Sequence, residues 1–118
     1  MNLPNSSKAV VEPRKLEDYL LNPAHPDNGG KAAFFRSLGF RQGNGRELRA
    51  ALLEMAAASG PAKCLDSPHG MKYILDGRIR GTDGNTAKAR TIWIVDTGQS
   101  APRLVTAYPA TTERMSHD

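Results

Sequence analysis

The spacing of the apolar residues changes near residue 60, and this change restricts the fold more than any other feature of the sequence. Before that point apolar side chains recur every three to four residues, which predicts three helices, at about 14–21, 31–39 and 46–58. After it they alternate with polar residues, which predicts three strands, at about 72–80, 87–95 and 102–108. We therefore expect an α+β fold in which two to three helices pack on one face of a three- to four-stranded antiparallel sheet.

One domain accounts for most of the chain. The sequence has 118 residues, and the predicted elements place a single domain at about 14–109. Residues 1–13 are expected to form an extended or disordered lead-in and residues 110–118 a disordered tail, because both segments are mainly polar. Prolines and glycines in residues 60–70 predict a loop before the first strand.

The composition points to a cytoplasmic protein that does not insert into a membrane. No apolar run approaches the roughly 20 residues that a membrane helix needs, and the first residues do not resemble a secretory leader. Cys64 is the single cysteine, so an intramolecular disulfide is excluded and a reducing compartment is favoured. The histidines and Cys64 lack the spacing of metal ligands, so we expect neither a metal nor another cofactor.

The net charge of +4 is concentrated in two segments. Residues 31–49 contain five basic residues and one acidic residue, and the predicted strands at 72–108 contain six basic residues and three acidic ones. A basic sheet surface can follow a phosphate backbone, which makes RNA a candidate partner. Besides Arg90, the strand residues expected to bind phosphates are Lys72, Arg78, Arg80, Lys88 and Arg103. A charge surplus that only keeps the protein soluble is the alternative.

The loop before the second predicted helix contains a candidate catalytic histidine. His25 lies between two prolines, and the loop ends in Gly29 and Gly30, where backbone N–H groups and Lys31 are expected to attract an anion. Metal-independent RNA cleavage needs a proton-transferring group beside cations that stabilise the phosphate. The competing interpretation is that His25 bonds to the loop backbone and Lys31 is a solvated first-turn lysine.

Two hydroxyl-bearing residues on the last predicted strand complete the candidate site. Thr106 and Tyr108 are two positions apart, so their side chains share one face of the sheet. Hydroxyl groups beside basic residues can orient a phosphate. Threonine and tyrosine also simply favour strands, which is the alternative explanation for both.

Several of these residues belong to sequence motifs that resemble a known family. The motifs are Asn-Pro-Ala-His-Pro-Asp-Asn-Gly-Gly-Lys-Ala-Ala-Phe-Phe at 22–35 and Arg-Leu-Val-Thr-Ala-Tyr-Pro at 103–109. They resemble an uncharacterised bacterial domain family whose members occur alone and at the C-terminal ends of polymorphic toxins. More remotely, the layout is similar to that of barnase/RelE-like ribonuclease toxins, which implies RNA cleavage without metal by histidine, basic and hydroxyl side chains. By residue type, the resemblance assigns catalytic roles to His25, Lys31, Arg90, Thr106 and Tyr108.

Three functional hypotheses follow. In the first, the protein is an RNA-cleaving toxin-type domain: His25 is the general acid or base, Lys31 and Arg90 hold the phosphate, and Thr106 and Tyr108 orient it. In the second, it is a non-catalytic module that docks an antitoxin, immunity protein or adaptor, and in the third it binds RNA without cleaving it. Convergence of the five candidate side chains beside an open cleft favours catalysis, and their dispersal disfavours it.

Overall fold

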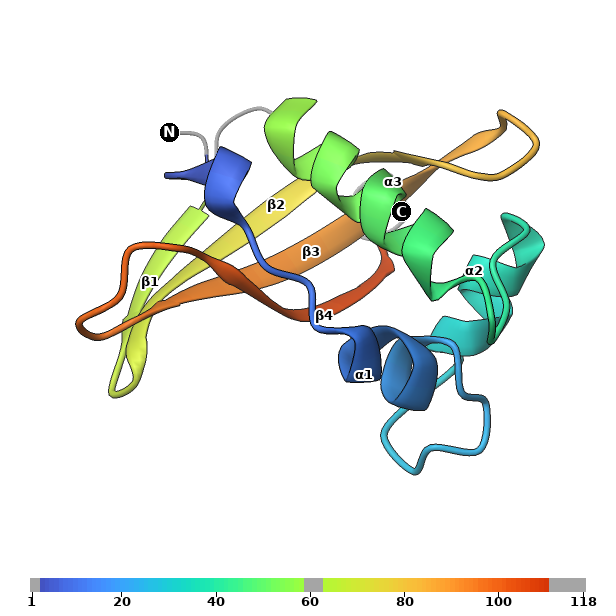
Figure 1. Ribbon diagram of the computed structural model, residues 1–118, viewed down its shortest axis with the longest axis horizontal. Coiled ribbons are helices and arrows are strands. Elements are labelled where there is room, and N and C mark those ends of the chain that lie inside the picture. The colour runs from blue at the N-terminus through green and yellow to red at the C-terminus, as the bar shows by residue number, and fades with distance from the viewer. Residues whose placement is uncertain (1–2, 59–62, 111–118) are drawn as a thin grey trace, which may run out of the picture.

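The structure is a computed structural model that describes residues 3–58 and 63–110, and it shows helices followed by a four-stranded antiparallel sheet (Figure 1). The predicted α+β class and the order of its elements are confirmed. In chain order the elements are η1 (Ser6–Lys8), α1 (Pro13–Lys15), η2 (Leu16–Leu20), α2 (Lys31–Ser37), α3 (Gly45–Ala58), β1 (Lys63–Ser67), β2 (Gly70–Arg80), β3 (Thr86–Asp96) and β4 (Arg103–Pro109). Here η1 is a 3₁₀ turn, and η2 is a π-helical turn that continues α1.

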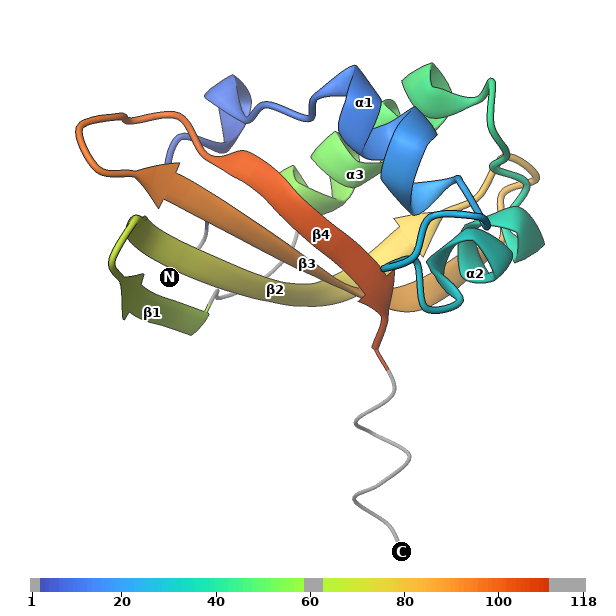
Figure 2. The same cartoon turned by 90° about the horizontal axis from the view of Figure 1, so that it is seen from below.

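The helices lie on one side of the sheet, whose strands follow the order β1-β2-β3-β4 (Figure 2). Helix α3 crosses this side, and α1 with η2 lies against the β4 edge (Figure 1). The described residues place no helix or strand over the other side, which we call the open face. Strand register assigns these side chains to it: Lys63, Leu65, Ser67, Lys72, Ile74, Asp76, Arg78, Arg80, Thr86, Lys88, Arg90, Ile92, Ile94, Asp96, Arg103, Thr106 and Tyr108. The last two lie on the edge strand β4, where η2 and α2 reach them.

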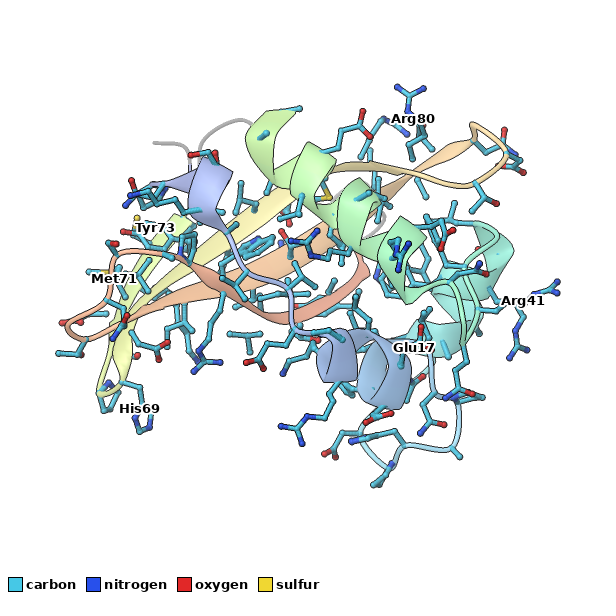
Figure 3. All side chains as sticks on the ribbon, in the orientation of Figure 1. Glu17, Arg41, His69, Met71, Tyr73 and Arg80 are labelled. Atoms are coloured by element: carbon cyan, nitrogen blue, oxygen red, sulfur yellow. The ribbon has the colours of Figure 1, made fainter. Side chains whose placement is uncertain are left out.

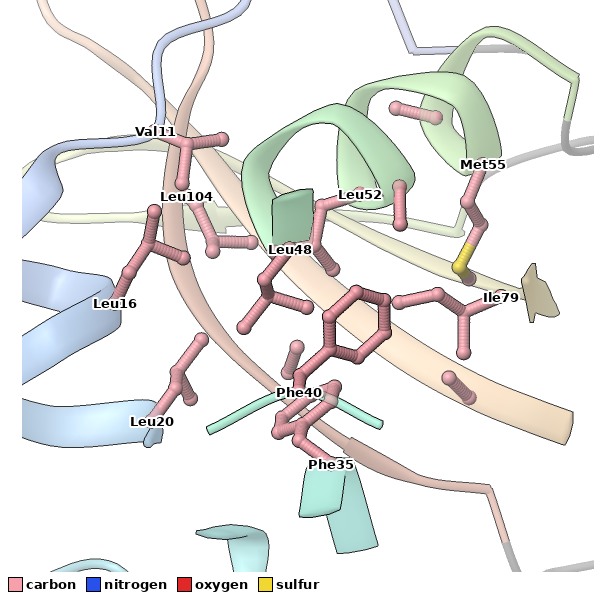
Figure 4. Packing of buried hydrophobic residues seen from close by; sticks show 14 of the residues in the cluster. Val11, Leu16, Leu20, Phe35, Phe40, Leu48, Leu52, Met55, Ile79 and Leu104 are labelled. Atoms are coloured by element: carbon pink, nitrogen blue, oxygen red, sulfur yellow. The ribbon is translucent and has the colours of Figure 1, made fainter. Parts of the chain in front are cut away.

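The core forms where the apolar stripe of α3 meets the inner side of the sheet (Figure 4). Leu48 and Leu52 are fully buried at helical spacing, as the sequence predicts. They pack in the same cluster as Phe35 from α2 and Trp93 from the central strand β3, both of which are also fully buried. One continuous core therefore joins the helices to the sheet, and it fixes η2 and α2 relative to β4.

The described part of the N-terminal segment is packed against the domain. Leu3 and Val11 are buried in the common core, although the sequence predicts only an extended or disordered lead-in. The Val10 N–H donates to the Pro102 carbonyl and the Leu104 N–H donates to the Val10 carbonyl, so the segment pairs beside β4. Isolated apolar residues among polar ones give no periodic signal, which explains why this packing is not predicted. Apart from Ala110, the predicted tail at 110–118 lies outside the described residues.

The prediction of a loop throughout residues 60–70 is wrong for Lys63–Ser67, which forms the edge strand β1. This strand pairs with β2 from Lys63 opposite Ile74 to Ser67 opposite Gly70. Its residues are mostly exposed on both sides, so it lacks the alternation of buried and exposed residues that reveals a strand. Pairing with β2, rather than local sequence preference, defines this strand.

The carboxylate of Glu17 ties η2 to the start of α3. Its two oxygens accept the backbone N–H groups of Gly43 and Gly45, each at 2.7 Å. Because a helix N-terminus leaves such N–H groups without partners inside the helix, Glu17 serves as a cap supplied by another element. Replacing Glu17 by alanine is expected to lower the free energy of unfolding by about 1–2 kcal/mol, measured by urea denaturation. Glu54→Ala, at an exposed position of α3, is the control, and equal effects of the two substitutions would contradict the cap.

Candidate functional site

Tyr19, in η2, joins two of the predicted catalytic residues from opposite ends of the chain. Its hydroxyl lies 3.1 Å from Oγ1 of Thr106 in β4, and either group can donate that hydrogen bond. Its ring meets the imidazole of His25 edge to face, with the ring centroids 5.0 Å apart. All three side chains are half-buried, so they are held in place yet still reach solvent.

Lys31, at the first position of α2, lies between two tyrosine rings. Its Nζ is 5.5 Å from the ring centroid of Tyr19 and 5.9 Å from that of Tyr108, within the range of cation–π attraction. The same ammonium group donates to the backbone carbonyls of Asp27, at 3.3 Å, and Asn28, at 3.1 Å. The position of this charge is therefore defined by the loop and by both tyrosines.

Arg90 contacts Tyr108 and forms an ion pair with Asp76. Arg90 lies opposite Tyr108 in the β3–β4 register, and its guanidinium makes a bidentate contact with Asp76 at 2.7 and 2.9 Å. Hydrogen bonding to Arg90 holds the pKa of Asp76 below its ordinary value. The same bond raises the pKa of Arg90, with a smaller contribution from Tyr108. Arg90 is thus a fixed cation whose charge is largely balanced by Asp76.

The five predicted catalytic residues therefore form one connected group. Contacts run from His25 to Tyr19, then to Thr106 and Lys31, and from Lys31 through Tyr108 to Arg90. Lys15 adds a second ammonium group, with its Nζ 5.5 Å from the centroid of the Tyr19 ring. The sequence singled out neither Tyr19 nor Lys15 as a functional residue.

The loop that carries His25 is fixed by Asn28, which is 3% exposed. The Asn28 side-chain amide donates to the carbonyls of Tyr19 and Leu20, and its oxygen accepts the Ala32 N–H at 2.8 Å. The Asn28 carbonyl also accepts the Lys31 N–H. The sequence predicts free backbone N–H groups at the start of α2. This prediction is wrong for the N–H groups of Lys31 and Ala32, because both donate to Asn28. Gly30, predicted to bind phosphate, is exposed and has a φ of 89°, so it supplies the turn into α2.

His25 is oriented by its own loop. Its Nδ1 accepts the backbone N–H of Asp27 at 3.0 Å. The neutral imidazole therefore carries its proton on Nε2, which is the nitrogen available to a substrate. This contact partly agrees with the competing interpretation that His25 bonds to the loop, and it leaves one ring nitrogen free for chemistry.

An open cleft of about 620 Å³ adjoins this group. Tyr19, His25 and Thr106 line it together, so three members of the connected group face a space that a ligand can enter. The other lining residues are mainly charged: Glu12, Arg14, Lys15, Asp18, Asp27 and, as an apolar contact, Val105. Three carboxylates and two basic side chains line this cleft, so its charge is mixed rather than uniformly basic.

The other predicted phosphate-binding residues are dispersed. Lys72, Arg78, Lys88 and Arg103 belong to the open face, and Arg103 is paired there with Asp96 at 2.7 Å. Arg80 lines a separate depression with Glu47 and Glu54 of α3, at the upper edge of the molecule in Figure 3. Of these five strand residues, Arg103 is held in an ion pair and Arg80 lies beside acidic side chains of α3. Lys72, Arg78 and Lys88 have no acidic partner among the described residues.

Residues 3–58 and 63–110 contain no group of three His, Cys, Asp or Glu side chains arranged to hold a metal ion. Among the helices of these residues, none is long and apolar enough to cross a membrane.

Comparison with known proteins identifies a family for this chain and a solved structure with a similar fold. A chain in the contact-dependent growth inhibition toxin–immunity protein complex from Klebsiella pneumoniae 342 matches with a TM-score of 0.67, covering 86% of this chain and 99% of that one. At 20% identity this match shows a shared fold. No curated protein matches the sequence. The model of a domain of unknown function, DUF6883, matches residues 2–111, so the chain belongs to the DUF6883 family.

Proposed function

We propose that this protein is a metal-independent RNA-cleaving domain of the toxin type. The observation that carries the proposal is the connected group of His25, Lys31, Thr106 and Tyr108 beside an open cleft, with Tyr19 at its centre. A proton-exchanging imidazole, a fixed ammonium and two hydroxyls within one half-buried cluster are the groups that phosphodiester cleavage requires. RNA, the substrate we assign, places the activity in the cytoplasm.

The reaction is an internal displacement at phosphorus. The ribose 2′-oxygen bonds to phosphorus and loses its proton to water, while the bond to the 5′-oxygen breaks and that oxygen takes a proton from the protonated imidazole of His25. The products are a 2′,3′-cyclic phosphate and a 5′-hydroxyl. The proton leaves His25 from Nε2, the ring nitrogen that does not face the Asp27 N–H. Lys31 stabilises the charge that develops on the phosphate.

The remaining members of the group orient the phosphate. Tyr108 and Thr106 lie on the same side of β4. Thr106 contacts Tyr19, and Tyr108 contacts Lys31. Arg90 is balanced by Asp76, so its part in this scheme is to fix Tyr108 rather than to supply a free charge. The shared fold of a chain from a toxin–immunity complex supports the toxin-type assignment and an immunity protein as the inhibitory partner.

The experiment is an RNA cleavage assay with purified protein in EDTA. Wild-type protein is expected to produce fragments ending in a 2′,3′-cyclic phosphate. Lys31→Met is expected to lower the rate by about 10²–10³-fold, because it removes a fixed charge at the developing anion. Arg36→Met removes an exposed cation from the same helix and serves as the matched control. A wild type that cleaves no RNA, or a Lys31→Met variant as active as Arg36→Met, would contradict the proposal.

A non-catalytic interaction module is the second candidate function, and the apolar residues of the open face favour it. Leu65 is 44% exposed there, and Ile74 and Ile92 pair directly across β2 and β3. Lys63 lies opposite Ile74, Lys72 lies opposite Leu65, and the Asp76–Arg90 pair borders Ile74 and Ile92, so charged side chains adjoin the apolar ones as they do at protein interfaces. An acidic protein partner suits this surface. Tight binding of an immunity protein by a wild type that does not cleave RNA would favour this function over the first.

A further inference from the structure

Tyr19 lies at the junction of the candidate site, although it belongs to a helical turn whose other apolar residues serve the core. Leu16 and Leu20 of the same turn are at most 2% exposed and belong to the core cluster. Tyr19 only packs against that cluster from its margin and instead lines the open cleft. An apolar anchor for η2 needs no hydroxyl and no exposure to a cleft.

The hydroxyl of Tyr19 fixes a group that otherwise rotates freely. A threonine hydroxyl turns about its Cβ–Oγ1 bond, and the direction of its proton is set by the hydrogen bonds that it makes. The 3.1 Å contact with Tyr19 occupies one hydrogen-bonding direction of the Thr106 oxygen. The remaining directions of that oxygen are thereby presented to the cleft that both residues line.

The ring of Tyr19 fixes two further groups by contacts that do not involve the hydroxyl. Its contact with the imidazole of His25 restricts the tilt of the imidazole ring, while the Asp27 N–H restricts rotation in the ring plane. The electron-rich ring also attracts the ammonium groups of Lys31 and Lys15, each 5.5 Å from the centroid. The hydroxyl and the ring thus act on different partners, so substitutions can separate them.

We infer that Tyr19 is a positioning residue of the site: its hydroxyl orients Thr106 and its ring orients His25 and Lys31. The kinetic part of this inference, an effect on kcat, rests on the proposed RNA cleavage. The structural part, the orientation of the three side chains, does not depend on any activity. The two parts are therefore tested by separate measurements.

The kinetic test is a double-mutant cycle with Tyr19→Phe and Thr106→Val. Each single substitution is expected to lower kcat for RNA cleavage about tenfold with KM unchanged, because positioning of a reacting group is lost while substrate binding is kept. The double variant is expected to be no slower than either single variant, since both remove the same interaction. Multiplicative losses in the double variant, or full activity of Tyr19→Phe, would overturn the role assigned to the hydroxyl.

The second test needs no cleavage and follows the His25 imidazole by NMR at constant pH. Tyr19→Leu is expected to shift the ring resonances of His25, because the ring contact is lost, whereas Tyr19→Phe leaves them close to those of the wild type. Tyr73→Leu, another half-buried tyrosine at the margin of the core, is the control for general loosening. Unchanged His25 signals in Tyr19→Leu would overturn the role of the ring. If the wild type cleaves no RNA but Tyr19→Leu moves His25, the proposed function fails and the positioning of His25 stands.

Discussion

Replacing His25 by alanine is expected to lower the rate of RNA cleavage by about 10²–10⁴-fold, the range observed when a group that transfers protons in catalysis is removed. The expectation depends on the position of the imidazole: it lines the cleft, touches Tyr19, and has Nε2 available because Nδ1 accepts the Asp27 N–H. Cleavage is measured under single-turnover conditions in EDTA, so that product release does not limit the rate.

The fold should tolerate this substitution. His25 is half-buried in a loop that is held chiefly by Asn28, so His25→Ala is expected to unfold at nearly the wild-type urea concentration. His69→Ala is the matched control, because His69 lies at the β1–β2 turn on the far side of the molecule from Glu17 and η2 (Figure 3). A His25→Ala variant that cleaves as fast as His69→Ala would remove His25 from the mechanism.

Replacing Trp93 by alanine is expected to lower the free energy of unfolding by about 3–5 kcal/mol, the largest effect that we expect on stability. Trp93 is fully buried in the central strand, and its Nε1 donates to Oγ1 of Thr91 at 2.9 Å. Alanine leaves a cavity in the common core. It also removes the hydrogen-bond donor that contacts Thr91, a residue that is itself 0% exposed.

Urea denaturation of three variants separates these contributions. Trp93→Phe keeps most of the ring and loses the hydrogen bond, so it is expected to cost less than Trp93→Ala. Leu65→Ala, at a position 44% exposed on β1, is expected to cost about 1 kcal/mol or less. A cost below about 1 kcal/mol for Trp93→Ala would show that β3 does not anchor the core.

The helical half of the fold was predictable because each helix carries a local signal. Leu48 and Leu52 form an apolar stripe at the spacing of α3, and Gly39, with a φ of 93°, follows α2 where a helix commonly ends. The edge strand β1 was missed because its residues are solvated on both sides. Its pairing with β2 depends on chain-wide geometry that no short window of sequence contains.

The candidate site was predictable in composition and only partly in arrangement. Tyr19 was missed because its spacing from Leu16 and Leu20 matches an apolar helix face, which is how a core tyrosine also appears. Sequence alone gives no sign that its hydroxyl meets Thr106. The burial of Asn28 is equally unpredictable, since asparagine beside glycines is typical of an exposed turn.

The ion pair of Arg90 could not be predicted from the sequence because it depends on strand register. By sequence Arg90 is one of six basic residues on the strands, and it was expected to hold a phosphate. In the structure it lies directly opposite Asp76, and the two side chains form an ion pair. Register depends on the turn at residues 81–85 and on packing along the whole hairpin, so the partner of a strand residue is known only when the strands are aligned.

The hydrogen bond between Tyr19 and Thr106 spans 87 positions of sequence, and β4 follows every other described element. During synthesis the N-terminal part of a protein leaves the ribosome first, so η2 and the histidine loop emerge long before the strand that completes their cluster. A nascent chain therefore lacks Thr106 and Tyr108 at the candidate site until β4 has paired with β3. A product of premature termination before Arg103 lacks both residues permanently, so under the proposed function incomplete copies are expected to cleave no RNA.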